Sequence, residues 1–137
     1  MLGKPPLVVY AENQAGQVLQ DPAGIVQIIW RPGLRRLSET QAVLTHARLA
    51  LQRFGWYRIF IDQSQMVPFT AEEQQWISTE WLPLAIQNGY RYGAIAVSSD
   101  VMVRLATAYI TTQIQNTPLT YRSFESGPEA QAWLQQQ

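Results

Sequence analysis

Hydrophobic and polar residues follow two alternating patterns along the chain, and these patterns predict its elements. Short apolar or β-branched runs, which are typical of strands, cover residues 7–12, 17–20, 25–30, 57–62, 91–98 and 119–124. The turn residues Asn13-Gln14-Ala15-Gly16 separate the first two runs, so we expect an N-terminal β-hairpin. The run at 25–30 is mostly apolar and is followed by Pro32-Gly33, which indicates a strand buried on both faces of a sheet.

Segments with helical spacing separate the later strands. They cover about residues 38–54, 70–87 and 100–114, and a short helix around Trp133 closes the chain. Capping boxes are predicted at Ser38 with Gln41, Thr70 with Glu73, and Ser126 with Glu129. Asp100 or Ser99 caps the remaining helix. Pro83 lies inside the second helix and removes a backbone hydrogen bond, so we expect a kink near Thr79.

The order of these elements predicts an α/β fold. An N-terminal β-hairpin leads into four β-α units, which is typical of a mostly parallel mixed sheet. The 137 residues suffice for one core but not for two independent domains, so we expect a single domain spanning residues 1–137.

The helix predicted at 100–114 is apolar on more than one side. Its main apolar face is predicted to hold Met102, Leu105, Ala106, Tyr109 and Ile110. Further apolar residues fall outside that face, at Val101, Val103, Ala108 and Ile114, and the polar positions are mostly Thr. A surface helix normally shows a charged face. Two interpretations follow: the sheet and a second subunit cover the helix, which makes a homodimer, or the helix is deeply buried in the monomer.

Charge and apolar run length limit the partners. Lys plus Arg and Asp plus Glu both total 10, so no net field attracts nucleic acid or an anionic membrane. The apolar run near the start, within residues 1–10, is too short for a signal-peptide core or a membrane span. We therefore expect a cytoplasmic protein with no nucleic-acid partner and no membrane span.

The chain contains no Cys and one His, His46. This excludes disulfides, thiolate ligands and cysteine nucleophiles. A lone His without clustered carboxylates is a poor metal site, and His46 has no visible partner for general-base work. We expect neither a metal nor a cofactor.

Polar residues follow the strand predicted at 57–62. Ligands in α/β sheets usually bind beyond the carboxyl ends of strands, which makes Asp62, Gln63 and Ser64 candidate site residues. The alternative is that Asp62 caps the loop by accepting backbone N–H groups. A triad of Ser64, His46 and Asp62 has no nucleophile-elbow sequence to support it, so hydrolysis is not expected.

Aromatic residues are numerous, with five Trp and six Tyr. Trp56, Trp81 and Tyr92 are candidates to line a pocket for an apolar ligand, and the alternative is that they form ordinary core. Trp76 lies away from the apolar stripe of its helix, which favours an interface or a pocket rim.

Two stretches, together with the order of the elements, resemble the STAS domain of bacterial anti-sigma-factor antagonists. The first is Arg58-Ile59-Phe60-Ile61-Asp62-Gln63-Ser64 running into Thr70-Ala71-Glu72-Glu73. It is similar to the STAS strand that ends in Asp, with the loop and the start of the phosphorylatable helix. The second, similar to the family's last strand and final helix, is Tyr121-Arg122-Ser123-Phe124 followed by Glu129-Ala130 and Trp133-Leu134. The element order is also similar to the smaller cores of lipid-binding CRAL-TRIO proteins.

The chain departs from this family at the phosphorylation motif. Classical antagonists carry Asp-Ser-Ser-Gly at the helix start, and the corresponding stretch here is Phe69-Thr70-Ala71-Glu72. The phosphoacceptor position is then Ala71, which has no hydroxyl. Thr70 is adjacent, but a Thr three residues before Glu73 is expected to cap the helix, and Glu72 and Glu73 would repel a phosphate.

The resemblance implies a non-enzymatic, bacterial, cytoplasmic module that interacts with a protein partner or regulates one, without the phosphoserine switch. The candidate interaction or regulatory residues are Asp62, Ser64, Thr70 and Trp76. The alternative function is that of a carrier for a small apolar or lipid-like ligand in a pocket lined by Trp56, Trp81 and Tyr92.

Overall fold

A computed structural model describes residues 6–137, so the first five residues of the segment weighed as a signal peptide lie outside the described residues. The described chain forms six strands. They are β1 (Val8–Glu12), β2 (Gly16–Asp21), β3 (Ile25–Trp30), β4 (Arg58–Asp62), β5 (Tyr92–Ala96) and β6 (Thr120–Phe124).

The strands form one sheet whose spatial order follows the chain, β1-β2-β3-β4-β5-β6. β2 pairs antiparallel with both β1 and β3, and β3, β4, β5 and β6 run parallel to one another. Parallel neighbours need a crossover connection, and a helical segment supplies it each time. The predicted fold class, a hairpin followed by four β-α units on a mixed sheet, is confirmed.

The helical segments fall where the spacing predicts them. They are α1 (Leu37–Phe54), α2 (Ala71–Trp76), η1 (Ile77–Trp81), α3 (Leu82–Gln87), α4 (Val101–Thr111), η2 (Thr112–Ile114) and α5 (Gly127–Gln135). The caps at Thr70, Asp100 and Ser126 are confirmed, since each side chain accepts a backbone N–H of the first helical turn. The capping box at Ser38 is wrong. Arg36 is the N-cap of α1, and its backbone N–H donates to the Glu39 side chain at 2.8 Å.

Pro83 is accommodated by a widened turn. α2, η1 and α3 follow one another without a break, and η1 is a π-helix in which the Leu82 N–H donates to the Ile77 carbonyl. A proline has no N–H to donate to the carbonyl four residues earlier, that of Thr79. The Thr79 hydroxyl donates to the Gln75 carbonyl at 2.8 Å. The disturbance expected near Thr79 is a π-helical turn.

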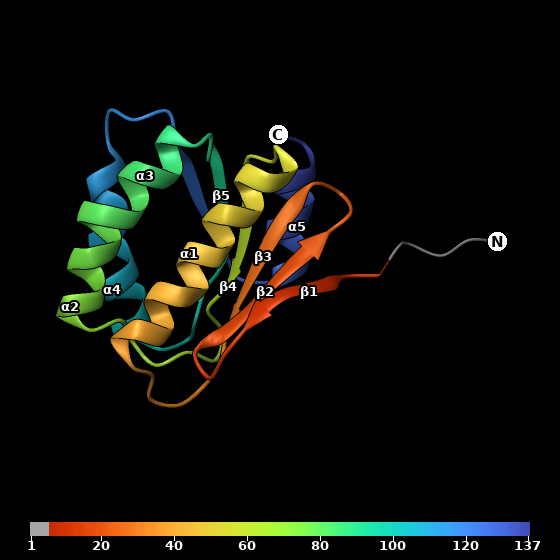
Figure 1. Cartoon of the computed structure of the whole chain (residues 1–137). Helices are drawn as coiled ribbons and strands as arrows, with labels where there is room; N and C mark the ends of the chain where they lie inside the picture. Colours follow the sequence, from red (N-terminus) through yellow and green to blue (C-terminus); the bar gives the residue numbers. More distant parts are fainter. Residues whose placement is uncertain (1–5) are drawn as a thin grey trace.

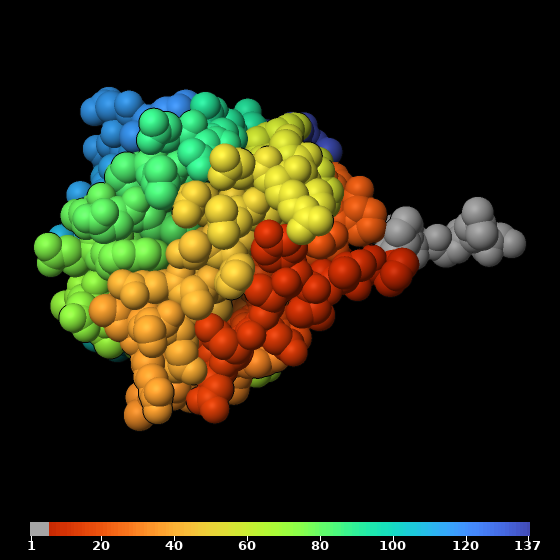
Figure 2. Space-filling view, viewed as in Figure 1, coloured from red at the N-terminus to blue at the C-terminus, as the bar shows by residue number. Residues whose placement is uncertain are grey.

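Helices cover the two faces of the sheet unequally. α1, α2, α3 and α4 lie on one face, and α5 lies on the other (Figure 1). Val26, Ile28 and Ile59 face the larger group of helices, whereas Ile25 and Phe60 face α5. In the space-filling view, α1 lies between the red hairpin and the green α2–α3 segment (Figure 2). The larger core therefore lies under α1 to α4.

Candidate functional site

The loop after β4 places Asp62 and Ser64 at the carboxyl edge of the parallel strands. Asp62 Oδ1 accepts the Ser64 backbone N–H at 2.9 Å and the Ser64 hydroxyl at 2.7 Å, which is the arrangement of a loop cap. His46 packs against Tyr10 of β1, with ring centroids 6.2 Å apart. Since β2 and β3 separate β1 from β4, His46 contacts the hairpin side of the sheet while Asp62 and Ser64 contact each other.

Thr70 is exposed and caps α2. Its hydroxyl accepts the Glu73 N–H at 3.1 Å, and its own N–H donates to Glu73 Oε1 at 2.8 Å. Glu73 also accepts a bidentate pair of hydrogen bonds from Arg35, at 2.7 and 2.9 Å, and one from the Thr40 hydroxyl. Ala71, at the position where the resemblance places a phosphoacceptor, is the first residue of α2.

The Arg35–Glu73 pair joins the loop after β3 to the first turn of α2. The Arg35 and Glu73 side chains are only 4% and 3% exposed, and Arg35 also donates to the Val67 and Pro68 carbonyls. Burial by itself would raise the pKa of Glu73. The hydrogen bonds from Arg35, Thr40 and the backbone outweigh it, so the pKa lies below its usual value. This cluster fixes the loop after β3 against the loop after β4.

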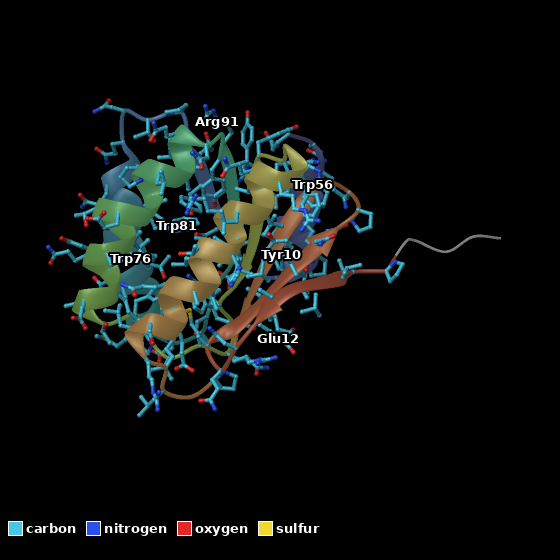
Figure 3. The ribbon with its side chains drawn as sticks, in the orientation of Figure 1. Tyr10, Glu12, Trp56, Trp76, Trp81 and Arg91 are labelled. Atoms are coloured by element: carbon cyan, nitrogen blue, oxygen red, sulfur yellow. The ribbon has the colours of Figure 1, made fainter. Side chains whose placement is uncertain are left out.

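The three candidate pocket aromatics lie in different places. Trp81 is buried in the larger core, where its Nε1–H donates to the Leu44 carbonyl at 2.6 Å. Trp56 packs against Phe54 at the end of α1, and Tyr92 packs against Trp133 of α5 on the other face of the sheet. Figure 3 shows Trp56 well away from Trp81 and Trp76. We predicted that these three residues line one pocket, but the fold places them in different regions.

Trp76 is the last residue of α2. Its side chain is partly buried and packs against the larger core, so it is not a free aromatic surface. A role of Trp76 at an interface or a pocket rim stays a prediction.

An apolar cavity lies between the sheet, η1 and α4. Its volume is about 40 Å³, and its lining includes Trp81, Ile61, Ile95, Ile110 and Tyr121. Neither Trp56 nor Tyr92 lines it. A cavity of roughly 150 Å³ is needed to admit benzene, and pockets for drug-sized ligands measure roughly 300–1,000 Å³. This space is too small for a lipid-like molecule.

The outer surface of α4 is the largest departure from an ordinary helix surface. Val101, Met102, Leu105 and Tyr109 are 64%, 60%, 59% and 56% exposed, and Ala108 beside them is also exposed. We call these five residues the α4 outer face. Apolar side chains gathered on one exposed face mark interaction surfaces in monomeric proteins. The candidate functional site is therefore a surface and not a cleft.

The opposite side of α4 corrects the predicted apolar face. Val103, Ala106 and Ile110 are buried against the larger core. Met102, Leu105 and Tyr109, which we predicted on the same face as Ala106 and Ile110, point outward. The helix is apolar on both sides, so the spacing alone did not determine which side the sheet would cover.

Comparisons with known proteins assign no family to this chain. No protein-family model matches the chain, and no curated protein matches it. Within residues 6–137, no three His, Asp or Glu side chains gather where they could hold a metal ion. No helix in this part of the chain is long and apolar enough to cross a membrane.

Two buried polar contacts were not predicted from the sequence. Arg35 was not singled out, although an Arg between a strand and a helix is a common partner for a buried carboxylate. Gln63, 3% exposed, accepts the Thr107 hydroxyl at 3.0 Å and links the loop after β4 to α4. Both contacts join residues more than thirty positions apart, and no local pattern signals such a contact.

Proposed function

We propose that this protein is a non-enzymatic interaction or regulatory module that docks a protein on the α4 outer face. The exposure of Val101, Met102, Leu105 and Tyr109 carries the proposal. A helix that is apolar all round is normally buried, and here one side is covered only by solvent within the described chain. Covering that side with a protein would remove apolar area from water, which is the main driving force for association.

The order of the elements supports a STAS-like assignment for this module, in a bacterial cytoplasmic protein. A hairpin leads into four β-α units on a sheet whose order follows the chain. The proposed module works without a phosphoserine switch, because Ala71 begins α2 and the Thr70 hydroxyl is engaged with the Glu73 N–H. Asp62 and Ser64 bond to each other, so their proposed role is to shape the loop after β4, whose Gln63 accepts the Thr107 hydroxyl of α4.

The carrier function is the weaker candidate. It needs a hollow lined by several aromatic side chains, and the cavity at Trp81 measures about 40 Å³. Self-association through residues 100–114 is one form of the interaction proposal, and it differs from docking of an unlike protein only in the identity of the occupant.

Site-specific photo-cross-linking tests whether any protein covers the α4 outer face. A benzophenone amino acid replaces Tyr109 in the full chain, which is expressed in cells that naturally produce the protein. Irradiation should give a covalent protein adduct, because the probe would lie inside the interface. Absence of an adduct from Tyr109 would contradict the proposal.

The matched control places the same probe at Tyr57. Tyr57 is also an exposed tyrosine, at 39%, but it lies next to β4 and its hydroxyl bonds to the carbonyl of Gln137. We expect no adduct of comparable yield there. Equal adducts from both positions would mean that capture is nonspecific and would count against a docking surface on α4.

A further inference from the structure

The α4 outer face is symmetric under reversal of the helix. Its members fall at positions 101, 105 and 109, one helical turn apart, with 102 and 108 beside them. An antiparallel copy centred on Leu105 would place Leu105 against Leu105, Met102 against Tyr109 on one flank, and Val101 against Ala108 on the other flank. Large side chains then meet on one flank and small ones on the other, and the two-fold axis repeats the same pairs at both ends of the interface.

We propose that the occupant of the α4 outer face is a second copy of this chain, with the two α4 helices antiparallel about a two-fold axis at Leu105. The inference rests on the proposed function and adds the identity and register of the partner. A two-fold interface uses the same patch on both subunits, so the patch must complement itself. The pairing of positions around Leu105 meets this requirement.

The size of the face fits a dimer of modest affinity. Side chains of these types that are slightly more than half exposed amount to roughly 400 Å² of apolar surface. A standard interface buries about 800 Å² on each partner, in an apolar centre with a polar rim. The face supplies about half of that area as the centre. Thr112 and Gln113 of η2 and Arg104 on the flank of α4 are exposed and can supply the rim.

Charge favours a second copy over a membrane surface. Helices that bind anionic lipids carry several Lys or Arg on their polar side. The one charged residue in α4 is Arg104, which is engaged with the Ser98 carbonyl and with Glu125 at 3.4 Å. None of the five outer residues is charged, and the chain has ten positive and ten negative side chains, so two copies meet without net repulsion.

Sedimentation velocity of the full chain measures the association. Between about 1 µM and several hundred µM, the weight-average mass should rise from one chain toward two, as expected for a small interface. Leu105→Glu places two carboxylates against each other at the axis and should leave a monomer over the whole range. Leu84→Glu is the matched control on α3, where Leu84 is 41% exposed, and it should dimerise as the wild type does.

Cysteine cross-linking tests the register, and the absence of native cysteine makes each introduced thiol unique. Leu105→Cys alone should form a covalent dimer with a short bis-maleimide. Met102→Cys and Tyr109→Cys should each cross-link poorly alone and efficiently when mixed, because antiparallel helices place these positions opposite each other. Efficient self-cross-linking of each separate variant would indicate parallel helices and overturn the register.

The outcomes separate this inference from the proposal on which it rests. A monomeric wild type at all concentrations, with an adduct to an unlike protein from the Tyr109 probe, overturns the second copy but leaves the docking surface. A monomer with no adduct overturns both. Circular dichroism melting of Leu105→Glu checks that it folds, and a dimer that persists in the folded variant also overturns the inference.

Discussion

At the scale of single residues, the most consequential contact is the buried pair of Arg35 and Glu73. Glu73 accepts hydrogen bonds from Arg35, from the Thr40 hydroxyl and from the Thr70 backbone, so its charge is fully compensated. Breaking such a pair by removing one partner leaves a buried charge without compensation. Arg35 then has no carboxylate partner, although its hydrogen bonds to the Val67 and Pro68 carbonyls remain.

Glu73→Gln should therefore lower the free energy of unfolding by about 3 kcal/mol, the lower part of the range for broken buried pairs. Denaturant unfolding of the purified variant measures this loss. Glu12→Gln is the matched control, because Glu12 also pairs with an arginine, Arg31, but both side chains are well exposed. The control should unfold almost as the wild type does. Equal losses in both variants would contradict the role assigned to burial.

The same carboxylate should make stability depend on pH. The pKa of Glu73 is lower in the folded protein than its usual value of about 4.5, so the unfolded chain binds the proton more readily. The stabilisation is complete above that value and is lost as the pH falls through the folded-state pKa. We expect the unfolding free energy of the wild type to drop below about pH 4.5, and that of Glu73→Gln to drop less. Parallel pH profiles would contradict this.

Gly93 leaves room for the buried Tyr90 and the partly buried Tyr121. The Tyr90 hydroxyl donates a hydrogen bond to the Tyr121 hydroxyl at 2.9 Å, and burial raises the pKa of both phenols. A Cβ at Gly93 would collide with the Tyr121 ring and the Tyr90 hydroxyl. Gly93→Ala should cost about 1–3 kcal/mol of unfolding free energy, as overpacked cores do. Gly127→Ala is the control, since its Cβ would lie 3.5 Å from Phe60, and it should be tolerated. Similar melting of the two variants would refute this packing account.

At the scale of elements, α4 has one side buried in the core and one apolar side that is exposed. Val103 is fully buried, whereas Leu105 is 59% exposed two residues later. Val103→Ala should lower the unfolding free energy by about 2 kcal/mol through lost burial and a residual cavity. Leu105→Ala should change it by less than about 0.5 kcal/mol when measured in dilute, monomeric protein. A large loss from Leu105→Ala under those conditions would mean that the outer face belongs to the core.

The sequence predicts elements well where local chemistry determines them. The apolar run of β3, the capping boxes at Thr70 and Ser126, and the α/β order all follow from neighbouring residues. The N-cap of α1 was mispredicted because the Glu39 side chain accepts a backbone N–H, which a residue of any type can donate. Ser38, a residue type that often caps helices, was therefore predicted in place of Arg36. The π-helical turn was expected only as a disturbance, since Pro83 removes a hydrogen bond without specifying how the backbone responds.

The candidate site was less predictable for a physical reason. Helical spacing reports that α4 is apolar on two sides, but only tertiary packing decides which side meets the sheet. Trp56, Trp81 and Tyr92 are near one another in an element diagram, yet strand pairing sends Tyr92 to the face covered by α5. The contact of Arg35 with Glu73 likewise joins the loop after β3 to α2, and these segments meet only after the parallel strands align.

At the scale of the whole molecule, the small cavity in the core and the exposed apolar side of α4 both support a docking module. The cavity under η1 holds about 40 Å³, while the α4 outer face exposes four large apolar side chains. A carrier requires an internal cavity large enough for its ligand, and a docking module requires an exposed apolar surface. The chain also lacks the net charge that would keep copies apart. These features together favour association of folded chains.

Native mass spectrometry of the purified full chain tests this account most directly, because one spectrum reports both assembly and any retained ligand. At a concentration where the wild type sediments mainly as a dimer, we predict a ligand-free dimer for the wild type and a ligand-free monomer for Leu105→Glu. A wild-type monomer whose mass includes a bound small molecule would contradict the account and support the carrier instead.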